Sequence, residues 1–481
     1  MRARVLALVV AALAAGCTVG PDFRAPDPPA VDRYTPGPPP AAPGMPRLVR
    51  DRDIPAQWWT VFGSAELDAL VRRALAQGPT LDQARARLVQ AQELRTARHG
   101  AVTYPQFDVT FGAERQRIDP ATFGFPQAPN PGPFNVFSLG GAVAYQFDLF
   151  GGARRDLEAL AAEVDYRAYE LEAARLTLAA NVVDTAIRQA SLAAQADLVA
   201  GVAAAQRRQL AIVEQRYADG AVAWLDVQRE RVEVARTVAL LPALRAQGAQ
   251  AGHVLAVLMG DPPGAATGPD VRLADLRLPA ELPLPLPAEL VRQRPDIRAS
   301  EALLHKASAD VGVATADLYP KLVVTGSFSS GQLELSHVLG SGINIWNVGL
   351  NVLQPVFRHE ELSARRRAAV AAWDQAAAGY RIAVLHGLQE VADVLRALEA
   401  DALTLAARSE QAARADDAFR IALARYDAGG VSQLVVLDAE RTRLEAEIDR
   451  VRAQAARYAS AAALFQALGG GWTSAQSATS P

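Results

Sequence analysis

The chain has 481 residues, of which 50% are hydrophobic and 21% are charged, and its formal net charge is −3. This composition excludes an intrinsically disordered chain, because disordered chains have too few apolar residues to form a core. The near-neutral charge gives no electrostatic footprint for nucleic acid, so no nucleic-acid partner is expected.

The N-terminus has the pattern of an export signal. Two arginines precede an apolar run at 5–13 and small residues at 14–16, and this run is too short to span a bilayer. We therefore predict a signal peptide over 1–16, cleaved before Cys17, the only cysteine. Cys17 is then the acceptor of a thioether-linked lipid, and 17–64 is a lipidated, extended N-terminal segment. An unmodified cysteine is the alternative. No second long apolar stretch follows, so no transmembrane helix is expected.

Residues 65–260 are predicted to form a first repeat of alternating helices and strands. Its main elements are a helix over 80–103, a β-hairpin over 105–149, a long helix over 153–217 and a helix over 223–259. Within 137–149, residues of one parity are large and apolar and those of the other are small or polar, which is typical of a strand with two unlike faces. From 153 to 217 apolar residues recur every seven positions, which indicates helices wound around neighbours.

A proline-rich connector over 261–289 is predicted to be extended chain and turns, since proline sustains neither a helix nor a central strand. The same elements then recur over 290–470. They are a helix over 296–318, a β-hairpin over 320–354, a long helix over 359–427 and a helix over 433–467, followed by a tail over 471–481.

The turn sequences repeat as well. RYADGAV at 216–222 is answered by RYDAGGV at 425–431. Gly220 and Gly429 suit the left-handed residue that closes a helix, and Ser432 is predicted to cap the helix that follows. Two copies of one unit imply internal pseudo-symmetry.

Strands of about ten residues fit either a half-buried soluble sheet or a membrane barrel. The export signal and the Pro/Gly-rich loop at 124–132 favour the barrel. Four strands do not close a barrel, and an open sheet edge is excluded in lipid. The protein must then be a symmetric oligomer, and the small polar strand faces favour three copies with twelve strands around a wet interior.

Several stretches carry a resemblance to a known family. They are GCTVGPDFRAP (16–26), QWWTVFGSAELDALV (57–71), LPAELVRQRPDIRASEALL (286–304), VLDAERTRLEAE (436–447) and both RYxxG turns. The chain resembles the outer-membrane channel subunits of tripartite efflux pumps, the TolC-like family, and within it the NodT-type lipoprotein branch.

The resemblance implies an α+β fold: a homotrimer with an all-antiparallel 12-stranded outer-membrane β-barrel, continued by a long periplasmic α-helical barrel and built from two internal repeats. The implied function is passive conduction of drugs, metals or other solutes from a periplasmic adaptor and an inner-membrane pump to the exterior. The implied location is the bacterial outer membrane, with a lipid anchor.

The resemblance also implies roles for residues at the two helix turns. Tyr217 and Gly220 in one half, and Tyr426 and Gly429 in the other, correspond to the periplasmic tip that faces the adaptor. A tyrosine offers such a partner a large contact with one polar end. The alternative is that each tyrosine only stabilises its turn.

The helix after the second turn is expected to carry the periplasmic gate. Asp438 matches the family's constricting carboxylate, and Leu434 lies one helical turn earlier on the same face. Three copies would form an apolar ring and an acidic ring, which restrict passage and favour cations. Val431 and Val435 stand where some members carry charged gating residues, so the closed state is expected to rest on apolar contact. An ordinary solvated helix residue is the alternative for Asp438.

Catalytic patterns are missing from the sequence. The six histidines show no pairing at metal-ligand spacing, no phosphate-binding glycine loop precedes a lysine, and GxSxG does not occur. We therefore predict no enzyme, no metal and no cofactor other than the lipid at Cys17. A lipid-anchored periplasmic coiled-coil scaffold or adaptor is the alternative function, which the duplicated strand–helix order disfavours.

Overall fold

The computed structural model describes residues 18–50, 54–265, 270–340 and 343–472. The chain divides into two compact units. Unit 1 contains Val89–Tyr166, Ser300–Tyr380 and the N-terminal stretch to Pro26, and unit 2 contains Asp27–Leu88, Arg167–Ala299 and the chain from Arg381. The predicted lipidation residue, Cys17, lies outside the described residues.

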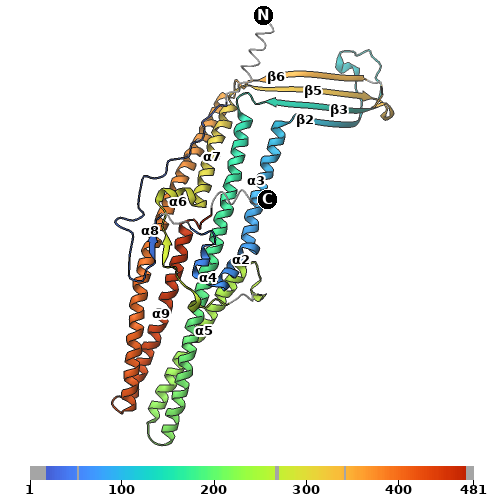
Figure 1. Cartoon of the computed structure of the whole chain (residues 1–481). Helices are drawn as coiled ribbons and strands as arrows, with labels where there is room; N and C mark the ends of the chain where they lie inside the picture. Colours follow the sequence, from blue (N-terminus) through green and yellow to red (C-terminus); the bar gives the residue numbers. More distant parts are fainter. Residues whose placement is uncertain (1–17, 51–53, 266–269, 341–342, 473–481) are drawn as a thin grey trace. The chain divides into compact units, whose positions relative to one another are not determined.

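Unit 1 is built around a four-stranded antiparallel sheet with the strand order β2-β3-β5-β6 (Figure 1). Its strands are β2 (Gln106–Gln116), β3 (Phe134–Phe147), β5 (Lys321–Gln332) and β6 (Ile343–Leu353). Strands β2 and β3 form one hairpin, β5 and β6 form the other, and β3 pairs with β5 between them. Each repeat therefore contributes one hairpin to a single sheet.

Unit 2 is mainly helical. It holds α2 (Ala65–Gln77), α5 (Trp224–Leu258), α6 (Pro287–Gln293) and α9 (Gln433–Ala467), with parts of α3 (Pro79–Thr103), α4 (Gly152–Ala218), α7 (Pro295–Ala316) and α8 (His359–Asp427). Within this unit α4 lies beside α5 and α8 beside α9, and both pairs end in a turn at the same end (Figure 1). The short helical turns and strands η1 (Trp58–Phe62), η3 (Pro263–Ala265), η4 (Leu273–Asp275), β1 (Arg47–Val49) and β4 (Glu281–Pro283) also belong to it.

The core of unit 2 forms where the N-terminal segment packs on the long helices. Trp58 stacks on Phe465 of α9, with ring centroids 5.5 Å apart, and Phe62 meets Tyr458 edge to face at 6.3 Å. The Tyr458 hydroxyl donates to the Leu276 carbonyl at 2.6 Å. The WWTVF stretch that helped to indicate the family is therefore a core element, because its large rings bury apolar area between α9 and the connector.

A two-stranded parallel ladder is absent from the sequence-based prediction. Strands β1 and β4 pair in parallel, with Leu48 opposite Leu282, so the segments expected to be only extended chain are joined by a strand pair. The antiparallel arrangement predicted for the barrel strands holds in the four-stranded sheet, and the parallel ladder is a separate element that the sequence did not indicate.

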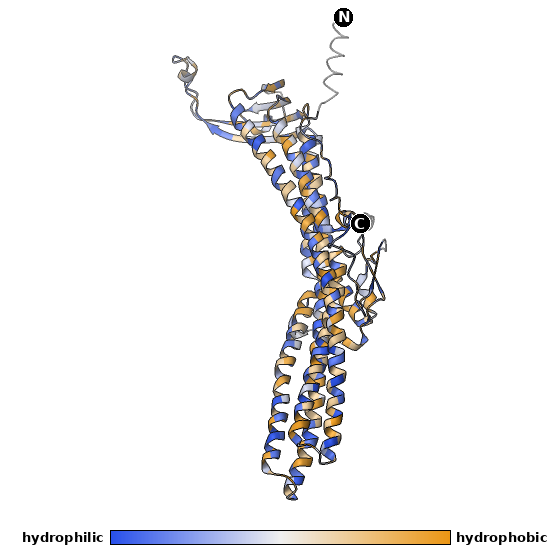
Figure 2. Cartoon of the chain, turned by 90° about the vertical axis from the view of Figure 1, so that its left-hand side faces the viewer, coloured by the Kyte–Doolittle hydropathy of each residue, from blue (hydrophilic) through white to orange (hydrophobic). Residues whose placement is uncertain are grey.

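The two halves share one element order. A helix, a β-hairpin, a long helix and a medium helix occur as α3, β2–β3, α4 and α5, and again as α7, β5–β6, α8 and α9. Helices α4 and α8 have 67 and 69 residues, and α5 and α9 have 35 each. Hydrophobic and hydrophilic residues alternate along these helices (Figure 2). Among the described residues, no helix combines the length and apolarity needed to cross a bilayer.

Candidate functional site

The strand register sorts the side chains of the sheet onto two unlike faces. One row across the sheet reads Phe107, Val143, Gly326, Val348, and the next reads Val109, Gly141, Phe328, Trp346. The row between them reads Asp108, Ala142, Ser327, Asn347, and the row on the other side of Phe107 reads Gln106, Ala144, Thr325, Gly349. The sequence prediction of one large apolar parity and one small polar parity is confirmed.

The apolar face is exposed in the single chain. Val348 is 75% exposed, Trp346 72% and Phe107 67%. On the polar face, the Asn347 amide donates to the Ser327 hydroxyl at 2.9 Å. A contiguous apolar surface of this kind indicates contact with lipid or a partner, because isolated soluble sheets do not leave such a face uncovered.

The two edge strands of this sheet are paired on one side only. Strand β2 pairs with β3 alone and β6 with β5 alone, among the described residues. These edges present free backbone donors and acceptors over the lengths of both strands, which makes them templates for further strands.

The helix turns of unit 2 have the same geometry in both halves. Gly220 has φ 73° and Gly429 has φ 72°. Gly220 N–H donates to Tyr217 O at 2.9 Å and Ala221 N–H to Arg216 O at 2.8 Å, and Gly429 and Gly430 repeat both bonds with Tyr426 and Arg425. This is the Schellman arrangement, in which glycine takes the left-handed position. The glycine prediction is confirmed.

Ser432 occupies the predicted N-cap position of α9, but its side chain accepts no capping bond. Its backbone carbonyl accepts from the Val435 N–H at 3.1 Å. At the equivalent start of α5, the Asp226 carboxylate accepts from the Ala223 N–H at 3.3 Å. The two turns therefore share their glycine geometry. The helices that follow them differ at their first residues, because a side chain accepts a backbone N–H at the start of α5 and the N-cap side chain of α9 makes no capping bond.

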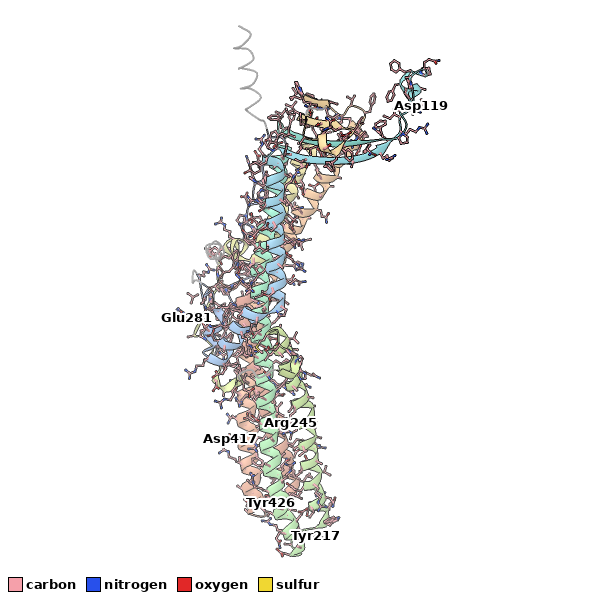
Figure 3. All side chains as sticks on the ribbon, turned by 90° about the vertical axis from the view of Figure 1, so that its right-hand side faces the viewer. Asp119, Tyr217, Arg245, Glu281, Asp417 and Tyr426 are labelled. Atoms are coloured by element: carbon pink, nitrogen blue, oxygen red, sulfur yellow. The ribbon has the colours of Figure 1, made fainter. Side chains whose placement is uncertain are left out.

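The two tyrosines lie at the turn end of the unit 2 helices (Figure 3). Tyr217 contacts Trp224 with ring centroids 5.1 Å apart, yet remains 44% exposed. Arg231 lies 5.1 Å above the Trp224 ring and pairs with Glu214 at 2.7 Å. Arg216 donates to the Tyr426 hydroxyl at 3.4 Å, which links the two hairpins. The tyrosines thus help to hold the turns together and still present aromatic surface.

The predicted gate residues line a groove of about 270 Å³ between α5 and α9. Leu434 is 55% exposed, and the Asp438 side chain is 62% exposed and pairs with Arg441. The groove continues onto α5 through Leu225, Val232 and Glu233. Leu434 and Asp438 therefore share one open face of α9 in the single chain.

Two buried glutamates behind this groove were missed by the sequence analysis. Glu230 on α5 is fully buried and Glu440 on α9 is 8% exposed. Gln433 donates to Glu230 at 2.8 Å, and Gln206 of α4 donates to Glu440 at 3.0 Å. Burial, with Glu440 adding charge repulsion, raises the pKa of Glu230 to about 7, and burial also raises the pKa of Glu440. Glutamate is usually exposed, so only their packing reveals them.

In the part of the chain that the structure describes, no cluster of three or more acidic, histidine or cysteine side chains could hold a metal. The stretch directly after Cys17 is anchored in unit 1. Buried Arg155 donates to the Val19 carbonyl at 3.3 Å and pairs with Asp22 at 2.6 Å, and Phe23 stacks on His305.

Comparison with known proteins identifies the family. The sequence matches the family profile described as outer membrane efflux protein over residues 70–261 and 286–470. The chain belongs to this family. It is 32% identical over 420 residues to the pyoverdine export outer membrane protein OpmQ of Pseudomonas aeruginosa, covering 87% of this chain and 88% of that protein. It is 25% identical over 448 residues to Nodulation protein T of Rhizobium leguminosarum bv. trifolii, covering 89% of each.

The fold agrees with the same family. The solved structure of the outer-membrane channel OprN matches with a TM-score of 0.83 at 31% identity, over 95% of this chain and all of that one. The protein is therefore the bacterial outer-membrane channel of an efflux pump, and it extends into the periplasm. It transports solutes and catalyses no reaction. The scaffold alternative is wrong.

Proposed function

We propose that three copies of this chain assemble into a conduit. Each copy supplies the four strands of unit 1, so that β6 of one copy pairs with β2 of the next in a barrel of twelve strands. The observation that carries this proposal is the sheet itself, which has one apolar face, one small polar face and two edges that pair with no other described strand. In a membrane such edges must be paired, because lipid offers no hydrogen bonds to the backbone.

The two faces then divide between lipid and water. The apolar rows through Val348 and Trp346 face the acyl chains, and the rows through Asn347 and Thr325 line an aqueous lumen. Acyl chains on Cys17 add a second attachment, since each buried methylene contributes about 0.8 kcal/mol. The anchored stretch at Val19 and Asp22 supports this, because it fixes the chain next to that cysteine.

The helical hairpins of unit 2 form the periplasmic part of the conduit. Their turns, with Tyr217 and Gly220 in one half and Tyr426 and Gly429 in the other, are the surface on which a periplasmic adaptor docks. The partial exposure of Tyr217 supports this role, because aromatic side chains are enriched at protein interfaces. An inner-membrane pump behind the adaptor supplies the energy.

Leu434 and Asp438 form the periplasmic gate. Threefold repetition of their shared face on α9 gives an apolar ring beside an acidic ring. The apolar ring resists wetting, and the carboxylates favour cations. Because Asp438 pairs with Arg441 of its own helix, closure depends on Leu434 more than on an ion pair between helices.

Single-channel recording in planar lipid bilayers tests the function. We expect stepwise, cation-selective currents from the purified full chain. Total absence of current from a correctly extracted protein would contradict the proposal. Pyoverdine is the first solute to test for transport, since OpmQ carries that name.

A further inference from the structure

Glu230 and Glu440 lie where three helices of unit 2 meet. Glu230 comes from α5, Glu440 from α9, and Gln206 from α4. Both carboxyls are buried, and among the described residues neither has an arginine or lysine at ion-pair distance. Each is held by one neutral amide. Two ionised carboxylates without cations are costly in such a place, and a bound proton removes that cost.

The polar atoms around the pair are incompletely satisfied. Oε1 of Glu230 and Oε1 of Gln206 are buried, and neither has a hydrogen-bond partner among the residues that the structure describes. An ionised glutamate can only accept, so a buried carboxylate oxygen without a donor leaves its charge unstabilised, whereas a protonated carboxyl is neutral. The arrangement therefore matches the protonated state of the pair better than the ionised state.

The charged groups around the pair do not offset its charge. Glu233 on α5 repels both carboxylates, and Arg443 on α9 attracts Glu440. Arg443 itself pairs with Asp416 of α8 at 3.5 Å and lies 4.3 Å over the Phe419 ring. Helix α4 presents the neutral Gln206.

The pair is connected to the gate through α9. Gln433 is the first residue of α9 and precedes Leu434, so the bond from Gln433 to Glu230 holds the start of that helix against α5. Glu440 lies two residues beyond Asp438 and fixes the opposite face of α9 on α4. A change at either carboxyl acts on the segment that carries the gate residues.

We propose that Glu230 and Glu440 form a proton-sensitive latch, which holds the start of α9 against α5 and α4 when protonated and releases it when ionised. The inference about gating rests on the function proposed above, whereas the latch itself does not. Acid conditions then favour the packed, closed tip and neutral conditions favour its opening.

The direction follows from linkage. Glu230 binds its proton more tightly in the packed state, with a pKa of about 7, than in a solvated state at the ordinary 4.5. The packed state is therefore fully favoured below pH 4.5 and loses that advantage as the pH rises to about 7. One such group changes the opening equilibrium by at most about tenfold per pH unit in this window, and the effect levels off above it.

Hydrogen exchange of the full chain in detergent tests the latch directly. The quantity to follow is the exchange of residues 433–441 between pH 5 and 8, corrected for the intrinsic pH dependence of amide exchange. We expect opening to increase about tenfold or more from pH 5 to 7 and then to level off. In Glu230→Gln with Glu440→Gln, which keeps shape and removes titration, exchange should stay at the low-pH level throughout.

Glu445→Gln is the matched control. It removes the same charge from the same helix at a side chain that is 70% exposed, so it should leave the wild-type pH profile unchanged. A wild-type profile that is flat after correction, or a double variant that keeps the wild-type profile, would overturn the latch.

Conductance at pH 5 and pH 7.5 tests the coupling to the gate. We expect the wild-type open probability to fall several-fold at pH 5, and the double variant to be equally closed at both values. A pH-dependent exchange profile without a pH-dependent open probability would overturn the coupling. If no current is seen at any pH, the channel proposal fails. The hydrogen-exchange measurement on residues 433–441 then still tests the latch.

Discussion

Arg294 joins three segments of unit 2, and its replacement should be costly. Its guanidinium donates to both carboxylate oxygens of Asp296, at 3.0 and 2.6 Å, and pairs with Glu390 of α8 at 2.7 Å. It also donates to the carbonyl of Ala467 at the end of α9, at 2.8 Å. The Arg294 side chain is 7% exposed.

The expected cost can be built from these contacts. The Asp296 side chain is 49% exposed and that of Glu390 is 55% exposed. Water therefore solvates each carboxylate when the guanidinium is removed, and each ion pair contributes only about 1 kcal/mol. The charge-assisted bond to Ala467 contributes about 1.5 kcal/mol, because its carbonyl is left unpaired. Arg294→Met should therefore reduce the free energy of unfolding by about 3.5 kcal/mol. Arg294→Lys keeps the positive charge but loses the planar set of N–H donors that the guanidinium presents. It should reduce the free energy of unfolding by about half as much.

Guanidinium unfolding of the detergent-solubilised protein, followed by far-UV circular dichroism, measures this cost as a shift of the midpoint. Arg292→Met is the matched control, because Arg292 is an exposed arginine of α6, the helix whose C-cap residue is Arg294. A cost for Arg294→Met below about 1 kcal/mol, no greater than that of the control, would refute the reasoning.

Two further predictions concern the proposed conduit. The double substitution Leu434→Ala with Asp438→Ala should raise the open-channel conductance and weaken cation preference, because it removes the apolar ring and the acidic ring together. Unchanged currents in planar bilayers would show that this face of α9 does not form the gate. Val348→Arg should destabilise the inserted barrel by about 2–4 kcal/mol if its side chain meets lipid near mid-bilayer, whereas Asn347→Arg on the opposite face should insert normally and shift selectivity towards anions. Equal insertion of both variants, measured by heat-modified electrophoresis, would contradict the assigned faces.

Much of the fold could be predicted because its signals are periodic. The alternation through Val143, Tyr145 and Phe147 predicts the face that the strand register confirms. The repeated turns were predictable from Gly220 and Gly429, since a left-handed backbone favours glycine strongly. Both features are determined by residues that lie close together in the sequence, so the sequence alone predicts them.

Features decided by distant packing were not predictable. The ladder of β1 with β4 involves three residues on each side, too few to show a period. Glu230 and Glu440 are glutamates on helices with mixed surfaces, and only contact with Gln206 and Gln433 shows that they are buried. Arg294 lies in a stretch used to recognise the family, and its role became visible only with Glu390 and Ala467 beside it.

The number of chains in the detergent-extracted particle tests the central claim most directly. Native mass spectrometry of the protein, released gently from detergent, counts the copies that complete the sheet edges of β2 and β6. Three copies are predicted, dissociating to single chains only on heating. A particle of one or two chains that remains folded after the detergent is removed would contradict the account.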